Sequence, residues 1–197
     1  MSYYFYSGVS RSSEGFTLVE AVISIGIIAV IASVVLFDHG EITETTTTRG
    51  IIERIDVHLR EAQVKATGSM GHNGDYSVGV GLYFVNESDR YVYFADDDGS
   101  DNIHVIANNF VYDGGDTEIS TENIGGGSEF SLCAGTGPGS CGSVNELNIV
   151  YLRPEPGPRI TDDAGDSYEY AEVTVEGSRT DAYKTLRVYS TGRTDIE

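Results

Sequence analysis

The most apolar stretch of the chain runs from Phe16 to Phe37. Its only charged residue is Glu20, and from Ala21 onward the stretch is uncharged. Its 22 residues would form a helix roughly 33 Å long, which is enough to cross a hydrocarbon core of about 30 Å. A soluble helix of this length would show a polar face. The pattern therefore predicts a membrane-inserted helix over residues 16–37.

A second helical pattern covers residues 38–67. Its apolar residues recur at steps of three and four and form one stripe: Ile51, Ile52, Ile55, Leu59, Ala62 and Ala66. Charged residues lie largely off this stripe, so we expect an amphipathic continuation of the first helix that packs on a sheet. Gly40 and the threonines of residues 45–48 have modest helix propensity, and we expect the helix to bend or loosen there. Gly68 marks its end.

From Tyr76 onward the pattern repeats every two residues, which predicts strands. The expected strands cover residues 77–85, 89–95, 103–112, 145–154, 168–177 and 183–193. The first two form a hairpin and the last two an antiparallel pair, whereas residues 122–143 and 154–166 are predicted to be loops. One long helix followed only by strands predicts an α+β fold, with the helix on one face of an antiparallel sheet and a β domain over residues 68–197.

The charge balance is strongly acidic, with 12 basic and 31 acidic residues and a net charge of −19. This balance argues against a nucleic-acid partner, because binding DNA or RNA relies on neutralising phosphates. It suits a solvated exterior. The motifs H-E-x-x-H, G-x-S-x-G and the phosphate-binding loop are absent, and the four histidines are scattered. We therefore predict no catalytic residue.

The single charge at Glu20 needs an explanation. A charge at the centre of a bilayer costs about 2.5–3.5 kcal/mol, so such residues are usually functional or paired; a carboxylate that reaches the interface is the alternative. A secretory signal would need a basic start and a shorter apolar run, but Arg11 is the only basic residue in residues 1–15. If the chain were cut after Gly15, Phe16 would carry a new amino group one helical turn from Glu20, where the helix dipole favours a carboxylate.

The sequence from Gly15 to Glu20, GFTLVE, followed by the apolar run, resembles the class III signal of type IV prepilins and pseudopilins. The resemblance implies that a prepilin peptidase removes residues 1–15 by cutting between Gly15 and Phe16, and then N-methylates Phe16. It implies that Glu20 aids assembly by neutralising a neighbour's N-terminus. In this sequence Glu14 stands where the leader usually ends in a base.

The layout of the remaining chain resembles the minor pseudopilins of type II secretion and minor type IV pilins. This resemblance implies a structural subunit of a pilus or pseudopilus, a single-pass inner-membrane protein whose globular domain lies outside the cytoplasm. Its partners would be other pilin or pseudopilin subunits, the prepilin peptidase and an inner-membrane assembly platform. The alternatives are a tip adhesin that binds a surface or a secreted substrate, and a membrane-anchored extracytoplasmic enzyme.

Two further groups of residues are candidate sites. Cys133 and Cys141 are the only cysteines, and in an exported domain we expect them to form a disulfide that closes a small loop. Asp96, Asp98 and Asp101 lie in an acidic segment that offers oxygen ligands for calcium, with a plain acidic turn as the alternative. Calcium is the only cofactor considered, and otherwise none is expected.

Overall fold

The computed structural model describes residues 15–68, 78–97, 110–152, 155–178 and 182–197, with the backbone alone for residues 35–45. The chain forms two compact units, Met1–Gly40 and Glu41–Glu197. The predicted leader lies outside the described residues, except for Gly15.

The helix of the described chain, α1, runs from Leu18 to Thr67 without interruption. The helix continues through Gly40 and residues 45–48, where we expected it to bend or loosen. The helix ends where Gly68 was expected to end it. There the Gly68 N–H donates to the carbonyl oxygen of Val64 at 2.7 Å, which closes the last turn.

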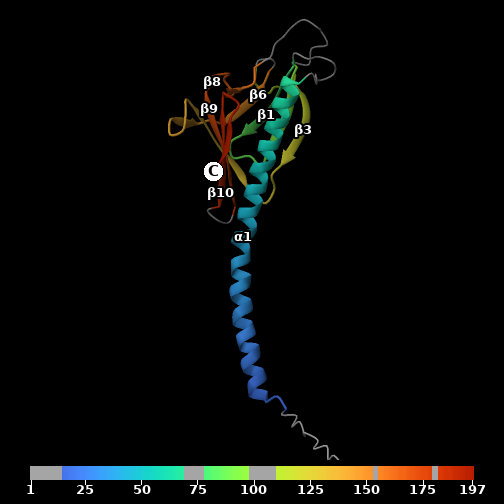
Figure 1. Cartoon of the computed structure of the whole chain (residues 1–197), viewed down its shortest axis with the longest axis vertical. Helices are drawn as coiled ribbons and strands as arrows, with labels where there is room; N and C mark the ends of the chain where they lie inside the picture. Colours follow the sequence, from blue (N-terminus) through green and yellow to red (C-terminus); the bar gives the residue numbers. More distant parts are fainter. Residues whose placement is uncertain (1–14, 69–77, 98–109, 153–154, 179–181) are drawn as a thin grey trace, which may run out of the picture. The chain divides into compact units, whose positions relative to one another are not determined.

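The described strands of the second unit form two antiparallel sheets (Figure 1), whereas the sequence pattern predicted one. The first sheet has six strands, in the order β3 (Thr117–Asn123), β2 (Arg90–Asp96), β1 (Gly79–Val85), β6 (Glu146–Tyr151), β7 (Pro158–Thr161) and β8 (Ser167–Tyr168). The second has five, in the order β11 (Thr194–Ile196), β10 (Tyr183–Tyr189), β9 (Tyr170–Glu176), β4 (Glu129–Gly135) and β5 (Cys141–Ser143). The α+β class is confirmed.

Two predicted pairings of neighbouring strands are confirmed. β1 and β2 form the expected hairpin, with Gly79 opposite Asp96. The backbone reverses through a turn in which Glu87 takes the left-handed conformation, with φ 59°. β9 and β10 form the expected antiparallel pair, with Tyr183 opposite Glu176.

Two predicted loops were wrong, because residues 122–143 contain β4, β5 and the end of β3, and residues 154–166 contain β7. β4 alternates buried and exposed side chains as a strand should, but the glycines on both sides hid it. β3 is largely polar because it forms an edge of its sheet. The strand expected at residues 103–112 lies mostly outside the described residues.

The core of the second unit lies between the helix and both sheets. The helix stripe is buried as expected, with Ile52, Ile55 and Leu59 fully inaccessible. It packs with the inward side chains of both sheets: Val80, Leu82, Phe84, Tyr91, Tyr93, Leu147, Ile149 and Tyr151 from the first, and Phe130, Leu132, Ala134, Ala171, Val173, Val175, Leu186 and Val188 from the second. One helix face therefore closes the core of two sheets.

Polar contacts attach this part of the helix to both sheets. The Tyr91 hydroxyl of β2 lies 3.0 Å from Nδ1 of His58. The Thr194 hydroxyl of β11 donates to Oδ1 of Asp56 at 2.7 Å, and Oδ2 of Asp56 pairs with Arg60 at 2.9 Å. Because the contacts reach the first sheet and the second, they hold the helix at one position over the core.

Candidate functional site

The predicted cleavage site lies just before the start of α1. Gly15, Phe16 and Thr17 precede the helix and are exposed, and 71% of Phe16 is accessible. The hydroxyl oxygen of Thr17 accepts a hydrogen bond from the Glu20 N–H at 3.2 Å, and the Thr17 carbonyl accepts one from the Ala21 N–H at 3.1 Å. This geometry makes Thr17 the N-cap residue. The Gly15–Phe16 peptide bond is therefore outside the helix.

Glu20 is the third residue of the helix and lies in its first turn. The positive end of the helix dipole favours a carboxylate at this place. Thr17 and Glu20 also have the T-x-x-E spacing of a capping box. We did not predict the cap at Thr17, although this spacing in the sequence was a sufficient signal.

The first part of the helix carries an exposed apolar surface. Its large apolar side chains are each more than half accessible: Leu18, Val19, Val22, Ile23, Ile25, Ile27, Ile28, Val30, Ile31 and Val34. The hydroxyls of Ser24 and Ser33 donate to backbone carbonyls of the helix itself, at 2.8 and 2.7 Å. Apolar surface on this scale indicates a contact with a membrane or with other proteins.

Within the described residues, no helix meets the length and apolarity that crossing a membrane requires.

The expected disulfide between Cys133 and Cys141 is present, with the two Cα atoms 5.6 Å apart. It joins β4 to β5, the edge strand of the second sheet, and so closes a hairpin rather than a loop. Glu172 of β9 lies opposite Cys133, and its carboxylate is within 4.8 Å of both sulfur atoms. Because both sulfurs are bonded to each other, they are not metal ligands.

The calcium hypothesis concerns residues that lie mostly outside the described part of the chain. Asp98 and Asp101 are not described. Asp96 is the last residue of β2 and is 2% accessible, and its Oδ2 accepts a hydrogen bond from the Phe110 N–H at 3.1 Å. The carboxylate of Asp96 thus anchors the chain that returns to the sheet, and calcium binding stays a prediction.

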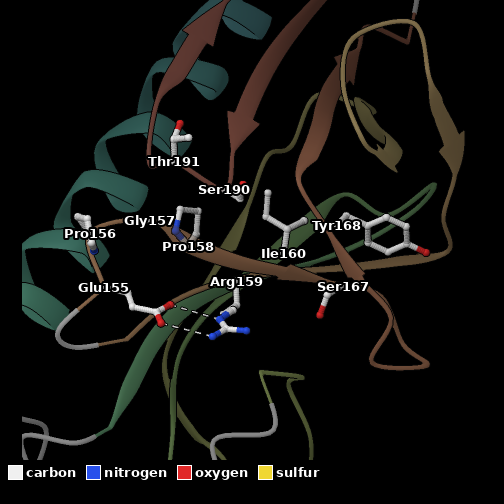
Figure 2. Close-up of a pocket in the computed structure, with 10 residues that line it drawn as sticks. All are labelled: Glu155, Pro156, Gly157, Pro158, Arg159, Ile160, Ser167, Tyr168, Ser190 and Thr191. Carbon is white, nitrogen blue, oxygen red and sulfur yellow. Dashed lines mark hydrogen bonds and ion pairs between the residues drawn. The ribbon is translucent and has the colours of Figure 1, made fainter.

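A hollow of about 420 Å³ lies where β7 and β8 meet the turn that follows β10. Figure 2 shows the Glu155 carboxylate facing the Arg159 guanidinium, an ion pair of 3.4 Å. The Tyr168 hydroxyl donates to Oδ2 of Asp162 at 2.8 Å, and this bond is the main cause that raises the pKa of Tyr168 to about 12. The ten residues that line the hollow include no histidine and no cysteine. They offer no nucleophile with an adjacent base.

The N-terminal residues match a known protein family. Residues 10–36 match the family described as the prokaryotic N-terminal methylation motif. This motif is the class III signal of type IV prepilins, so the resemblance of GFTLVE to that signal is confirmed. No curated protein and no solved structure matches the chain. The family match ends within the first unit, at residue 36, so it does not cover the second unit.

Proposed function

We propose that the chain is the precursor of a structural subunit of a type IV pilus or a type II secretion pseudopilus. A prepilin peptidase cuts it between Gly15 and Phe16 and methylates the new N-terminus of Phe16. The observation that carries the proposal is the class III signal at residues 10–36. The exposed position of the Gly15–Phe16 bond outside the helix supports it.

The proposed assembly uses the exposed apolar part of α1. Residues 16–37 first anchor the subunit in the inner membrane and then pack against the same segment of neighbouring subunits. Helices in such bundles associate through close packing and polar contacts rather than through exclusion from water. In that surrounding Glu20 meets the amino group of a neighbour's Phe16. The carboxylate therefore guides incorporation of the subunit.

In the proposed organisation, residues 1–15 are a cytoplasmic leader, residues 38–67 continue the helix, and residues 68–197 form the exported domain. The disulfide between Cys133 and Cys141 suits an oxidising compartment outside the cytoplasm. A net charge of −19 would make densely packed copies repel one another. This favours a minor component at a fibre tip, or a fibre whose charge is screened by salt.

Mass spectrometry of the mature N-terminus tests the proposal. We expect the chain to begin at an N-methylated Phe16 in cells that contain a prepilin peptidase, and to begin at Met1 in cells that lack it. A chain that keeps Met1 in the presence of the peptidase, or that is cut beyond Phe37, would overturn the proposal.

The role of Glu20 is tested by Glu20→Gln, which keeps the shape of the side chain and removes its charge. Removing one partner of a buried ion pair costs about 3–5 kcal/mol, so we expect incorporation into fibres to fall about 100-fold or more. Membrane insertion and cleavage should continue. Ser24→Ala, one turn further along the helix, is the matched control. Normal incorporation of the Glu20→Gln subunit would show that charge pairing does not guide assembly.

A further inference from the structure

We propose that Thr17 is a positioning residue for the cleavage. Its side chain sets the start of α1 at Leu18 and so keeps the Gly15–Phe16 peptide bond in non-helical, accessible chain. This inference rests on the proposed function, because it concerns the bond that the peptidase is proposed to cut.

The contacts at the start of the helix define this role. The first four N–H groups of any helix have no partner within it. The Thr17 hydroxyl satisfies the N–H of Glu20, and the Thr17 carbonyl accepts the first hydrogen bond of the helix, from Ala21. Gly15 and Phe16, the two residues before Thr17, have side chains that cannot accept a hydrogen bond. Thr17 is thus the last capping residue before the apolar run.

Without this cap the helix has other places to start. The upstream residues of types that favour N-caps are Gly15 and, before it, Ser13. A helix capped by Gly15 would begin at Phe16, and one capped by Ser13 would have Glu14, Gly15 and Phe16 as its first three residues. The scissile bond would then lie at or within the first helical turn. Proteolysis is favoured in exposed, non-helical chain, so cleavage would be slower.

The size of the effect follows from the strength of such caps. Replacing a threonine N-cap with a residue that cannot accept a hydrogen bond shifts the helix equilibrium by about 2- to 30-fold. The apparent affinity of a substrate falls in proportion to the population of its competent conformation, so this factor is the largest weakening of binding that loss of the cap can cause. We therefore expect the KM for cleavage to rise by up to about 30-fold, while kcat stays near the value of the unsubstituted chain because the bound conformation is unchanged.

The test uses the full-length precursor in detergent micelles with a purified prepilin peptidase, and measures kcat and KM for the appearance of Phe16 as the N-terminus. Thr17→Val keeps the branched shape and removes the acceptor, and it should show the rise in KM. Thr17→Ser and Thr17→Asn keep an acceptor and should behave like the original chain. Ser24→Ala removes a hydroxyl that is not a cap, and it should leave both constants unchanged.

The outcomes separate this inference from the proposed function. If the unsubstituted precursor is not cut after Gly15, the proposed function fails. If it is cut, and Thr17→Val is cut with the same KM, the capping inference is overturned and the proposed function stands. If Thr17→Ser and Thr17→Asn are as poor as Thr17→Val, the threonine is contacted directly by the peptidase, and the capping inference is again overturned.

Discussion

The disulfide between Cys133 and Cys141 gives a stability prediction that can be worked from the structure. The two cysteines are separated by 8 positions in sequence. A loop of that length, closed in the unfolded chain, corresponds to about 2.5 kcal/mol at 25 °C in the chain-entropy treatment. For a folding unit of 150 residues or more, 2.5 kcal/mol corresponds to a shift in Tm of about 5–10 °C. We therefore expect Cys133→Ala/Cys141→Ala to lower Tm by this amount.

Because the disulfide holds an edge strand, its removal should also have a local effect. β5 is a strand of three residues at the edge of its sheet, and it pairs only with β4 among the described strands. Part of the loss should therefore appear as faster amide hydrogen exchange in residues 141–143, before the unit unfolds globally. Thermal unfolding of the full chain in detergent, with and without a reducing agent, measures the global effect.

Thermal unfolding with a reducing agent also provides the control. Reducing agent should lower the Tm of the unsubstituted chain and leave the Tm of the double variant unchanged. If the double variant and the oxidised chain have the same Tm, the entropic reasoning is wrong, and the pairing of β4 with β5 is sufficient to hold the hairpin.

The remaining predictions concern the core and the tyrosines. Leu59→Ala should lower the free energy of unfolding by about 2–5 kcal/mol, because Leu59 of the helix is fully buried in the core that the helix forms with both sheets. Val57→Ala, at an exposed position of the same helix, should change it by no more than about 0.5 kcal/mol in denaturant titrations. Equal losses for the two variants would contradict the packing. Burial raises the pKa of Tyr151 to about 12, and the bond to Asp162 does the same for Tyr168, from an ordinary value of 10.0. The stability that comes from keeping these two tyrosines neutral is therefore fully present below pH 10 and should be lost as the pH rises from 10 to 12. Phenolate absorbance measures the ionisation, and circular dichroism measures the loss of the fold. Tyr168→Phe should flatten that loss, and an unchanged profile would show that the bond to Asp162 is not the cause.

Local patterns predicted the elements whose identity depends on nearby residues. The helical stripe through Ile55 and Leu59 is buried as its period indicated, and the β1–β2 hairpin is formed by strands that are adjacent in sequence. The class III signal is also local, because it consists of adjacent residues within the segment 10–36. The N-cap at Thr17 was not predicted, although its signal, the T-x-x-E spacing, is equally local.

Distant pairing explains what the local patterns did not show. β4 is bordered by glycines, and it is a strand because Leu132 pairs with Val173 of β9, far along the chain. β7 follows a segment rich in proline, a residue that cannot donate to a sheet ladder, yet its Ile160 pairs with Ile149 of β6. A sheet is stabilised by neighbours that the chain brings together only on folding.

The sequence by itself determined the class III signal and the start of the helix, because both depend on residues adjacent in sequence: a glycine, a threonine cap, a carboxylate and an apolar run. Only the tertiary structure decided that the second unit contains two sheets and that the cysteines lie on an edge hairpin. It also placed one helix face over both sheets. These features depend on hydrogen bonds and burial between residues that are distant in sequence, and no local period records which strands will meet.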